Sequence, residues 1–129
     1  MTIHVAAGVL RNGAGEVLLA ERLEAGPFQG LWEFPGGKIA DGESAAHALH
    51  RELQEELGIE VIASAPFLQL CHSYDDRSVD LEFFLVDEWR GEPTGVEGQR
   101  LRWVGIGDLN AAELLPADAP LLAALQSAH

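Results

Sequence analysis

Apolar residues recur with a helical period in one stretch of the chain, residues 45–57. At about 100° per residue, five of them fall on one side of a helix: Ala45, Ala48, Leu49, Leu53 and Leu57. Ser44 occupies an N-cap position ahead of this stretch, and Gly58 occupies a helix-stop position after it. The pattern therefore predicts an amphipathic helix between Ser44 and Gly58.

Apolar runs elsewhere predict strands on both sides of this helix. Residues 3–10 and 17–20 flank the turn sequence NGAG, which predicts a hairpin. Residues 32–34 are predicted to be extended, because Pro35 disfavours helix in the residue before it. The other predicted elements are strands at 60–70 (kinked near Pro66), 79–89 and 101–106, a polar turn at 71–78, loops at 23–31 and 91–98, helical turns over 108–115 and a final helix over 120–127.

Three glutamates disturb the amphipathic pattern of the predicted helix. Glu52 and Glu56 project into the apolar arc, and Glu55 lies at its edge. Like charges at this spacing repel one another, and an unpaired buried charge costs several kcal/mol. A divalent cation removes the conflict, and clustered carboxylate oxygens suit Mg²⁺ or Mn²⁺. The alternative is an ordinary charged surface helix, which fits less well with glutamates that share the apolar side and follow a glycine-rich loop.

The composition narrows the class of protein. A chain of 129 residues with 47% hydrophobic residues is sufficient for one folded domain, which we assign to residues 1–129. The formal net charge of −13 argues against DNA or RNA as a partner, since phosphate binding requires a basic surface. Cys71 is the one cysteine, which excludes an internal disulfide. Because the sequence has neither a signal-peptide pattern nor an apolar run of about 18 residues, we expect a cytoplasmic protein without membrane attachment.

The acidic stretch and the loop before it resemble the Nudix box, the signature of the Nudix hydrolase family. The pattern is G-x5-E-x7-R-E-U-x-E-E-x-G-U, in which U is a bulky aliphatic residue. Its positions are filled by Gly37, Glu43, Arg51, Glu52, Leu53, Glu55, Glu56, Gly58 and Ile59. The resemblance implies a Nudix fold of the α/β (α+β) class, an α/β/α sandwich with a mixed β-sheet between helices. It also implies metal-dependent hydrolysis of a phosphoanhydride in a nucleoside diphosphate linked to another group.

Two further segments are similar to the MutT-like branch of that family, LWEFPGGK at 31–38 and GEPTGVEGQ at 91–99. The similarity implies metal ligands at the Gly36 carbonyl, Glu52, Glu55, Glu56 and Glu97. We choose Glu52 as the catalytic base, with Glu97 as a second candidate, and we place Arg51 and Glu55 with it as catalytic residues, Arg51 orienting a glutamate through a charge-assisted hydrogen bond. The implied substrate-binding residues are Arg22, Phe34, Lys38, Arg77 and Asp118. Arg22, at a strand end, is equally consistent with a solvated surface residue.

The similarity implies hydrolysis of a nucleoside triphosphate to a monophosphate and pyrophosphate, with 8-oxo-dGTP as the expected substrate. Asp118 leaves an alternative open, because the matching position in MutT carries an asparagine that reads oxidised guanine. An amide both donates and accepts, whereas an ionised carboxylate only accepts and so favours donors such as the cytosine amino group or guanine N–H groups. The alternative substrate is therefore (d)CTP or a modified cytosine nucleotide. Asp118 is also a candidate cap for the final helix.

The alternative from a different class of protein is a Nudix-fold nucleotide sensor that does not hydrolyse. Such a protein would be expected to have lost the acidic core of the box, and here that core is intact. We therefore expect an enzyme that binds a small nucleotide, requires Mg²⁺ or Mn²⁺ and acts as a monomer.

Overall fold

The computed structural model describes residues 1–128. This part of the chain contains β-strands, two α-helices and two short 3-10 helices. The predicted helix is present with the predicted caps: the Ser44 side chain accepts from the His47 N–H, and Gly58 ends the helix in a left-handed conformation. In chain order the elements are β1 (Thr2–Leu10), β2 (Glu16–Glu21), β3 (Trp32–Glu33), β4 (Gly36–Lys38), α1 (Ala45–Leu57), β5 (Glu60–Ser73), β6 (Ser78–Arg90), β7 (Leu101–Gly105), η1 (Ile106–Asp108), η2 (Ala111–Glu113) and α2 (Ala119–Ala128).

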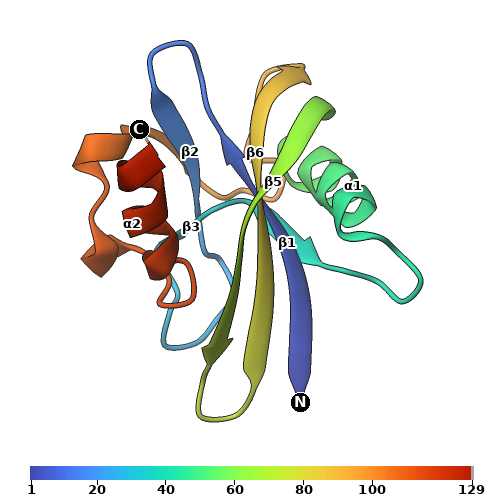
Figure 1. Ribbon diagram of the computed structural model, residues 1–129, viewed down its shortest axis with the longest axis vertical. Coiled ribbons are helices and arrows are strands. Elements are labelled where there is room, and N and C mark those ends of the chain that lie inside the picture. Colours follow the sequence, from blue (N-terminus) through green and yellow to red (C-terminus); the bar gives the residue numbers. More distant parts are fainter. Residues whose placement is uncertain (129) are drawn as a thin grey trace.

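The strands lie between the two helices, with α1 on one side and α2 on the other (Figure 1). They form a four-stranded mixed sheet of order β4-β1-β6-β5, in which β1 and β6 are parallel, and a three-stranded antiparallel sheet of order β3-β2-β7. The predicted fold, a mixed sheet between helices, is confirmed, with the sheet divided in two. No helix in residues 1–128 is long and apolar enough to cross a membrane.

Each helix covers its own apolar cluster. Leu49, Leu53 and Leu57 of α1 are fully buried and pack against residues of β1 such as Ala6 and Leu10. Gly8 belongs to the same face of β1, because a Cβ there would lie 3.1 Å from a Leu53 methyl carbon. The small residues at this point of β1 therefore let α1 pack closely onto the sheet. A second cluster includes Leu121 and Leu125 of α2.

The predicted hairpin between the first two strands is wrong. The NGAG turn forms, and the Asn12 side chain accepts from the Ala14 and Glu16 N–H groups. Beyond a single bridge between Arg11 and Val17, however, the two strands enter different sheets. Both edges of β1 are taken by β4 and β6, so β2 pairs with β3 and β7 instead.

Three other local predictions differ from the structure. The stretch before the acidic helix is predicted as a glycine-rich loop, but its glycine pair belongs to β4, where backbone pairing with β1 satisfies the peptide groups. The polar turn after β5 is shorter than predicted, since β5 continues to Ser73. The helical turns predicted over 108–115 are two short 3-10 helices, Ile106–Asp108 and Ala111–Glu113, and the Asn110 side chain caps the second by accepting from the Ala112 N–H. The predicted irregularity near Pro66 is confirmed by a register shift between Pro66 and Leu68.

The packing of α1 predicts that substitutions at two adjacent positions, Leu53 and Gln54, have very different effects on the free energy of unfolding. Leu53→Ala removes a fully buried side chain and should lower the free energy of unfolding by about 2–5 kcal/mol. Gln54→Ala, on the exposed face, is the matched control and should change it by less than about 0.5 kcal/mol. Urea denaturation followed by circular dichroism measures both values. Equal effects of the two substitutions would contradict the burial of Leu53 on the sheet-facing side of α1.

Candidate active site

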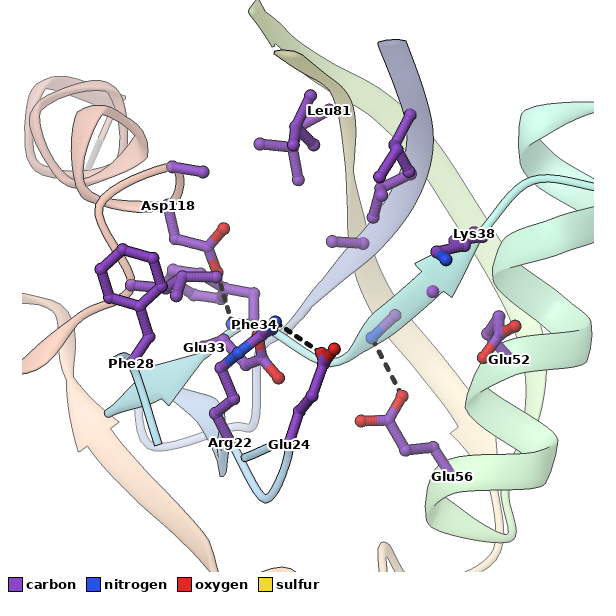
Figure 2. Close-up of a pocket in the computed structure, with 18 of the residues that line it drawn as sticks. Arg22, Glu24, Phe28, Glu33, Phe34, Lys38, Glu52, Glu56, Leu81 and Asp118 are labelled. Atoms are coloured by element: carbon purple, nitrogen blue, oxygen red, sulfur yellow. Dashed lines mark hydrogen bonds and ion pairs between the residues drawn. The ribbon is translucent and has the colours of Figure 1, made fainter. Parts of the chain in front are cut away.

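A cavity of about 360 Å³ opens between the two sheets, and residues of both line it. One end is acidic: Glu52 and Glu56 of α1 face β4 there (Figure 2), and the loop after β6 adds Glu97 to the lining. The other end is largely aromatic and closes with Asp118, which lies just before α2. Residues at the acidic end include Gly36, Gly37, Glu52, Glu56 and Glu97, and residues at the far end include Phe28, Phe34, Tyr74 and Asp118.

The acidic end depends on the glycine pair of β4. Gly36 and Gly37 pair with Ala7 and Ala6 of β1. A Cβ on Gly37 would lie 2.3 Å from the Glu52 carboxyl carbon, and a Cβ on Gly36 would lie 2.1 Å from the Ala6 carbonyl oxygen. Real side chains never approach so closely. Gly37 therefore makes room for the Glu52 carboxylate of α1 beside β4, and Gly36 lets β4 lie close against the backbone of β1.

Glu56 is the most perturbed of the acidic residues at this end. Its carboxylate accepts a hydrogen bond from the Gly36 N–H at 3.2 Å. Burial, followed by the negative charges of Glu33, Glu97 and Glu52, raises the pKa of Glu56 to about 8. A carboxyl group in such a place resists ionisation until a cation compensates its charge.

The chemistry of these donors fits a hard divalent cation. Glu52, Glu56 and Glu97 come from two segments of the chain and face one cavity, and all offer oxygen atoms. No group of three acidic, histidine or cysteine side chains in residues 1–128 is already arranged around one point as a metal site. Binding a cation would therefore draw these carboxylates closer together.

Arg51 and Glu55 lie outside the lining of the cavity. Arg51 donates to Glu43 twice at 2.8 Å, to Glu52 at 2.8 Å and to the Lys38 carbonyl at 3.0 Å. This network joins the loop, β4 and α1, and it lowers the pKa of Glu43 to about 2. The Glu55 side chain is 60% exposed and lies 3.5 Å from the Arg51 guanidinium. The structure thus brings Glu52, Glu56 and Glu97 into the cavity, but not Glu55.

Three predicted phosphate or substrate contacts do line the cavity: Arg22, Lys38 and Arg77. Arg22 donates to Glu24 at 2.6 Å and to Glu33 at 3.1 Å, so its side chain is paired and largely buried. The Arg77 Nε atom is buried and makes no hydrogen bond within residues 1–128. Its guanidinium lies 6.0 Å from the centre of the Tyr74 ring. An acceptor on a ligand would satisfy this orphaned donor.

Asp118 and Phe34 form the floor of the far end. Asp118 is only 3% exposed, and one of its carboxyl oxygens accepts from the Phe34 N–H at 2.9 Å. Its side chain therefore bonds to Phe34 and not to α2, which argues against a role as helix cap. Burial, aided by the charge of Glu33, raises the pKa of Asp118 to about 7.

The sequence did not single out several residues that line the cavity, and three of these, Glu33, Gln99 and Tyr74, hold other parts of the site. Glu33 faces Arg22, and its pKa is raised because burial outweighs the attraction of that arginine. Its position beside Phe34 in the LWEFPGGK segment was an available signal. Gln99 ends the GEPTGVEGQ segment and is buried. Tyr74 had no signal, because its hydroxyl meets the Ala117 N–H through a contact between distant segments.

The arrangement of two helices around divided sheets, with a glycine strand against an acidic helix, is that of the Nudix fold. A family profile described as NUDIX domain matches residues 2–125. The chain therefore belongs to the Nudix family, and the predicted class of enzyme, a hydrolase of nucleotide phosphoanhydrides, is confirmed. Hydrolases of this family generally need a divalent metal ion.

Known relatives cover almost the whole chain. It is similar to the 8-oxo-dGTP diphosphatase of Haemophilus influenzae, with 42% identity over 93% of this chain and 88% of the relative. It is also similar to the CTP pyrophosphohydrolase of Escherichia coli, with 36% identity over 97% of this chain and 92% of the relative. A solved structure from a study of MutT from Aliivibrio salmonicida and Vibrio cholerae matches the full length of both chains with 34% identity and a TM-score of 0.84.

The close approach of β4 to α1 predicts that Gly37→Ala weakens metal binding. The added methyl group would displace the Glu52 carboxylate, the mobile end of a side chain, so the fold should survive. We expect Mn²⁺ affinity, measured by electron paramagnetic resonance of free Mn²⁺, to fall tenfold or more. The control is Gly13→Ala, where a Cβ meets nothing within 4 Å. Equal Mn²⁺ affinity of the two variants would contradict the role given to Gly37.

The raised pKa of Glu56 predicts a pH-dependent cost in the metal-free protein. Because its folded pKa of about 8 exceeds the ordinary value of 4.5, the folded state binds more protons between these values, and stability falls as pH rises through them. In EDTA, Glu56→Gln should therefore be more stable than the wild type at pH 8.5, by up to a few kcal/mol. The difference should vanish near pH 4.5. Thermal unfolding measures it, and a wild type that is more stable than Glu56→Gln at pH 8.5 would refute this account.

Proposed function

We propose that this protein is a Mg²⁺- or Mn²⁺-dependent pyrophosphohydrolase that converts a nucleoside triphosphate to a monophosphate and pyrophosphate, with 8-oxo-dGTP as its preferred substrate. The observation that carries the proposal is a single cavity with a carboxylate cluster at one end and buried Asp118 among aromatic rings at the other. These ends suit the phosphates and the base of one nucleotide. The proposal assigns this activity to one domain, residues 1–129, acting as a monomer.

The residues at the acidic end perform two tasks in the proposed reaction, which are metal binding and proton transfer. Glu52, Glu56, Glu97 and the Gly36 carbonyl would hold the metal, which supplies charge neutralisation and a water of lowered pKa. Glu52 accepts the proton of the attacking water, and Arg51 orients it through the 2.8 Å hydrogen bond. Glu55 contributes through Arg51, given its exposed position.

The cationic residues of the cavity have a second task, which is to hold the phosphates. Lys38 lines the cavity at the end of β4, next to the glycine pair. Arg22 offers a planar guanidinium that suits a phosphate, and substrate binding would draw it from Glu24, its exposed partner. In a protein of net charge −13 these local cations offset the repulsion of a triphosphate.

The proposed preference for one nucleobase over another is based on Asp118 and on the known relatives. The 8-oxo-dGTP diphosphatase of Haemophilus influenzae supports an oxidised purine, and the CTP pyrophosphohydrolase of Escherichia coli supports cytosine as the second candidate. One oxygen of Asp118 is committed to the Phe34 N–H. The second carboxyl oxygen of Asp118 is free to contact the nucleobase. When the acid is neutral this oxygen donates a hydrogen bond, which suits a carbonyl of 8-oxoguanine. When the acid is ionised it accepts, which suits the cytosine amino group.

The function is tested by measuring pyrophosphate release from 8-oxo-dGTP, dGTP, dCTP and CTP with Mg²⁺. We expect kcat/KM for 8-oxo-dGTP to exceed that for dGTP tenfold or more, which corresponds to about 1.4 kcal/mol. Glu52→Gln should lower kcat by about 10² or more, and Gln54→Ala, on the exposed face of the same helix, should leave it unchanged. A preference for CTP would establish the second candidate. Release of pyrophosphate from none of the four would indicate a nucleotide sensor.

The raised pKa of Asp118 predicts that the preference of the enzyme for one nucleobase over another changes with pH. As pH rises through about 7, Asp118 loses its proton and its donor, so the ratio of kcat/KM for 8-oxo-dGTP to that for CTP should fall. Asp118→Asn keeps a donor at every pH, so its ratio should stay constant. Both ratios are measured between pH 6 and pH 8.5, where substrate and metal effects common to both enzymes cancel. An identical slope for the wild type and Asp118→Asn would exclude Asp118 as the reader.

A further inference from the structure

Gln99 is a buried polar side chain for which the proposed reaction has no role. It is 6% exposed, and only Asp118 shares this degree of burial among the polar and charged residues described. Both ends of its side-chain amide are hydrogen-bonded. Nε2 donates to the Glu56 carbonyl oxygen and Oε1 accepts from the Glu97 N–H, both at 2.9 Å. The polarity of these backbone groups determines the orientation of the amide.

These two hydrogen bonds connect the segments that carry the carboxylates. The last carbonyls of a helix have no partner within the helix. Here the Thr94 N–H donates to the Leu57 carbonyl at 3.0 Å, and the Val96 N–H donates to the Glu56 carbonyl at 3.3 Å. Gln99 adds the third bond of this contact. The loop that carries Glu97 is therefore docked on the C-terminal end of α1.

The loop folds tightly around Gln99. A Cβ on Gly95 would lie 2.1 Å from the Gln99 carbonyl oxygen, and Gly98 has φ +87°, a conformation that favours glycine. The Gly98 N–H closes the turn on the Gly95 carbonyl at 3.0 Å. Oε1 of Gln99 is the side-chain atom that holds the backbone of Glu97 directly, in addition to the backbone hydrogen bonds that dock the rest of the loop.

We propose that Gln99 is a positioning residue that fixes Glu97 relative to Glu56, so that carboxylates from two separate segments can bind one cation. The inference rests on the proposed function, because it concerns the metal-dependent site of that reaction. Glu97 influences Glu56 electrostatically, and both line the acidic end of the cavity. An amide satisfies both backbone partners. A thioether satisfies neither, and a carboxylate satisfies only the Glu97 N–H.

The experiment measures Mn²⁺ affinity by electron paramagnetic resonance for the wild type, Gln99→Met, Glu97→Gln and the double variant, without nucleotide. If Gln99 acts through Glu97, Gln99→Met should weaken Mn²⁺ binding tenfold or more in the wild type and less than twofold in the Glu97→Gln background. The control is Gln126→Met, which removes a side-chain hydrogen bond to the Ile106 carbonyl away from the cavity and should leave Mn²⁺ affinity within twofold. Gln99→Glu keeps the hydrogen bond from the Glu97 N–H and loses the one to the Glu56 carbonyl. Its Mn²⁺ affinity is compared with that of the wild type if Gln99→Met does not fold.

Two results would overturn the inference. One is unchanged Mn²⁺ affinity in the Gln99 variants with reduced thermal stability, which would show a purely structural anchor. The other is a full additional loss of affinity in the double variant, which would show that Gln99 acts independently of Glu97. Failure of the proposed function is seen separately, as absence of pyrophosphate release by the wild type, and it leaves the Mn²⁺ comparison intact.

Discussion

The structure depends on the close approach of the carboxylates of α1 to the backbone of β4. The glycine pair makes room for it, since any side chain on Gly37 would occupy the place of the Glu52 carboxylate. Arg51 joins the loop, the strand and the helix around this contact. The arrangement places Glu56 where ionisation is unfavourable, so the protein tolerates a local loss of stability at the point where a cation would bind.

The division of the strands into two sheets creates the cavity, and the contact between α1 and β4 forms the acidic end of that cavity. β1 pairs with β4 and β6, whereas β2 leaves it after a single bridge and pairs with β3 and β7. Strands of both sheets contribute to the cavity, and Ala7 of β1 faces it while Gly8 packs under α1. The alternation of neighbouring residues in one strand thus separates the substrate side from the packing side.

The sequence predicted local features well where a single segment determines them. The helix and its caps follow from Ser44, Gly58 and the apolar spacing between them, and the Nudix box follows from its fixed positions. The hairpin prediction failed because pairing of β1 and β2 depends on competition from β4 and β6, which are distant in the sequence. Tyr74 was missed for a similar reason, since it meets Ala117 only in the folded chain.

The central claim is that the acidic end of the cavity is unstable without a cation and is stabilised by one. The most direct test is calorimetric unfolding of the wild-type protein at pH 8, in EDTA and in increasing Mn²⁺, without nucleotide. The account predicts a saturable rise in Tm with Mn²⁺, because an ion that binds the folded state alone stabilises it by mass action. The same Tm in EDTA and in saturating Mn²⁺ would contradict the account.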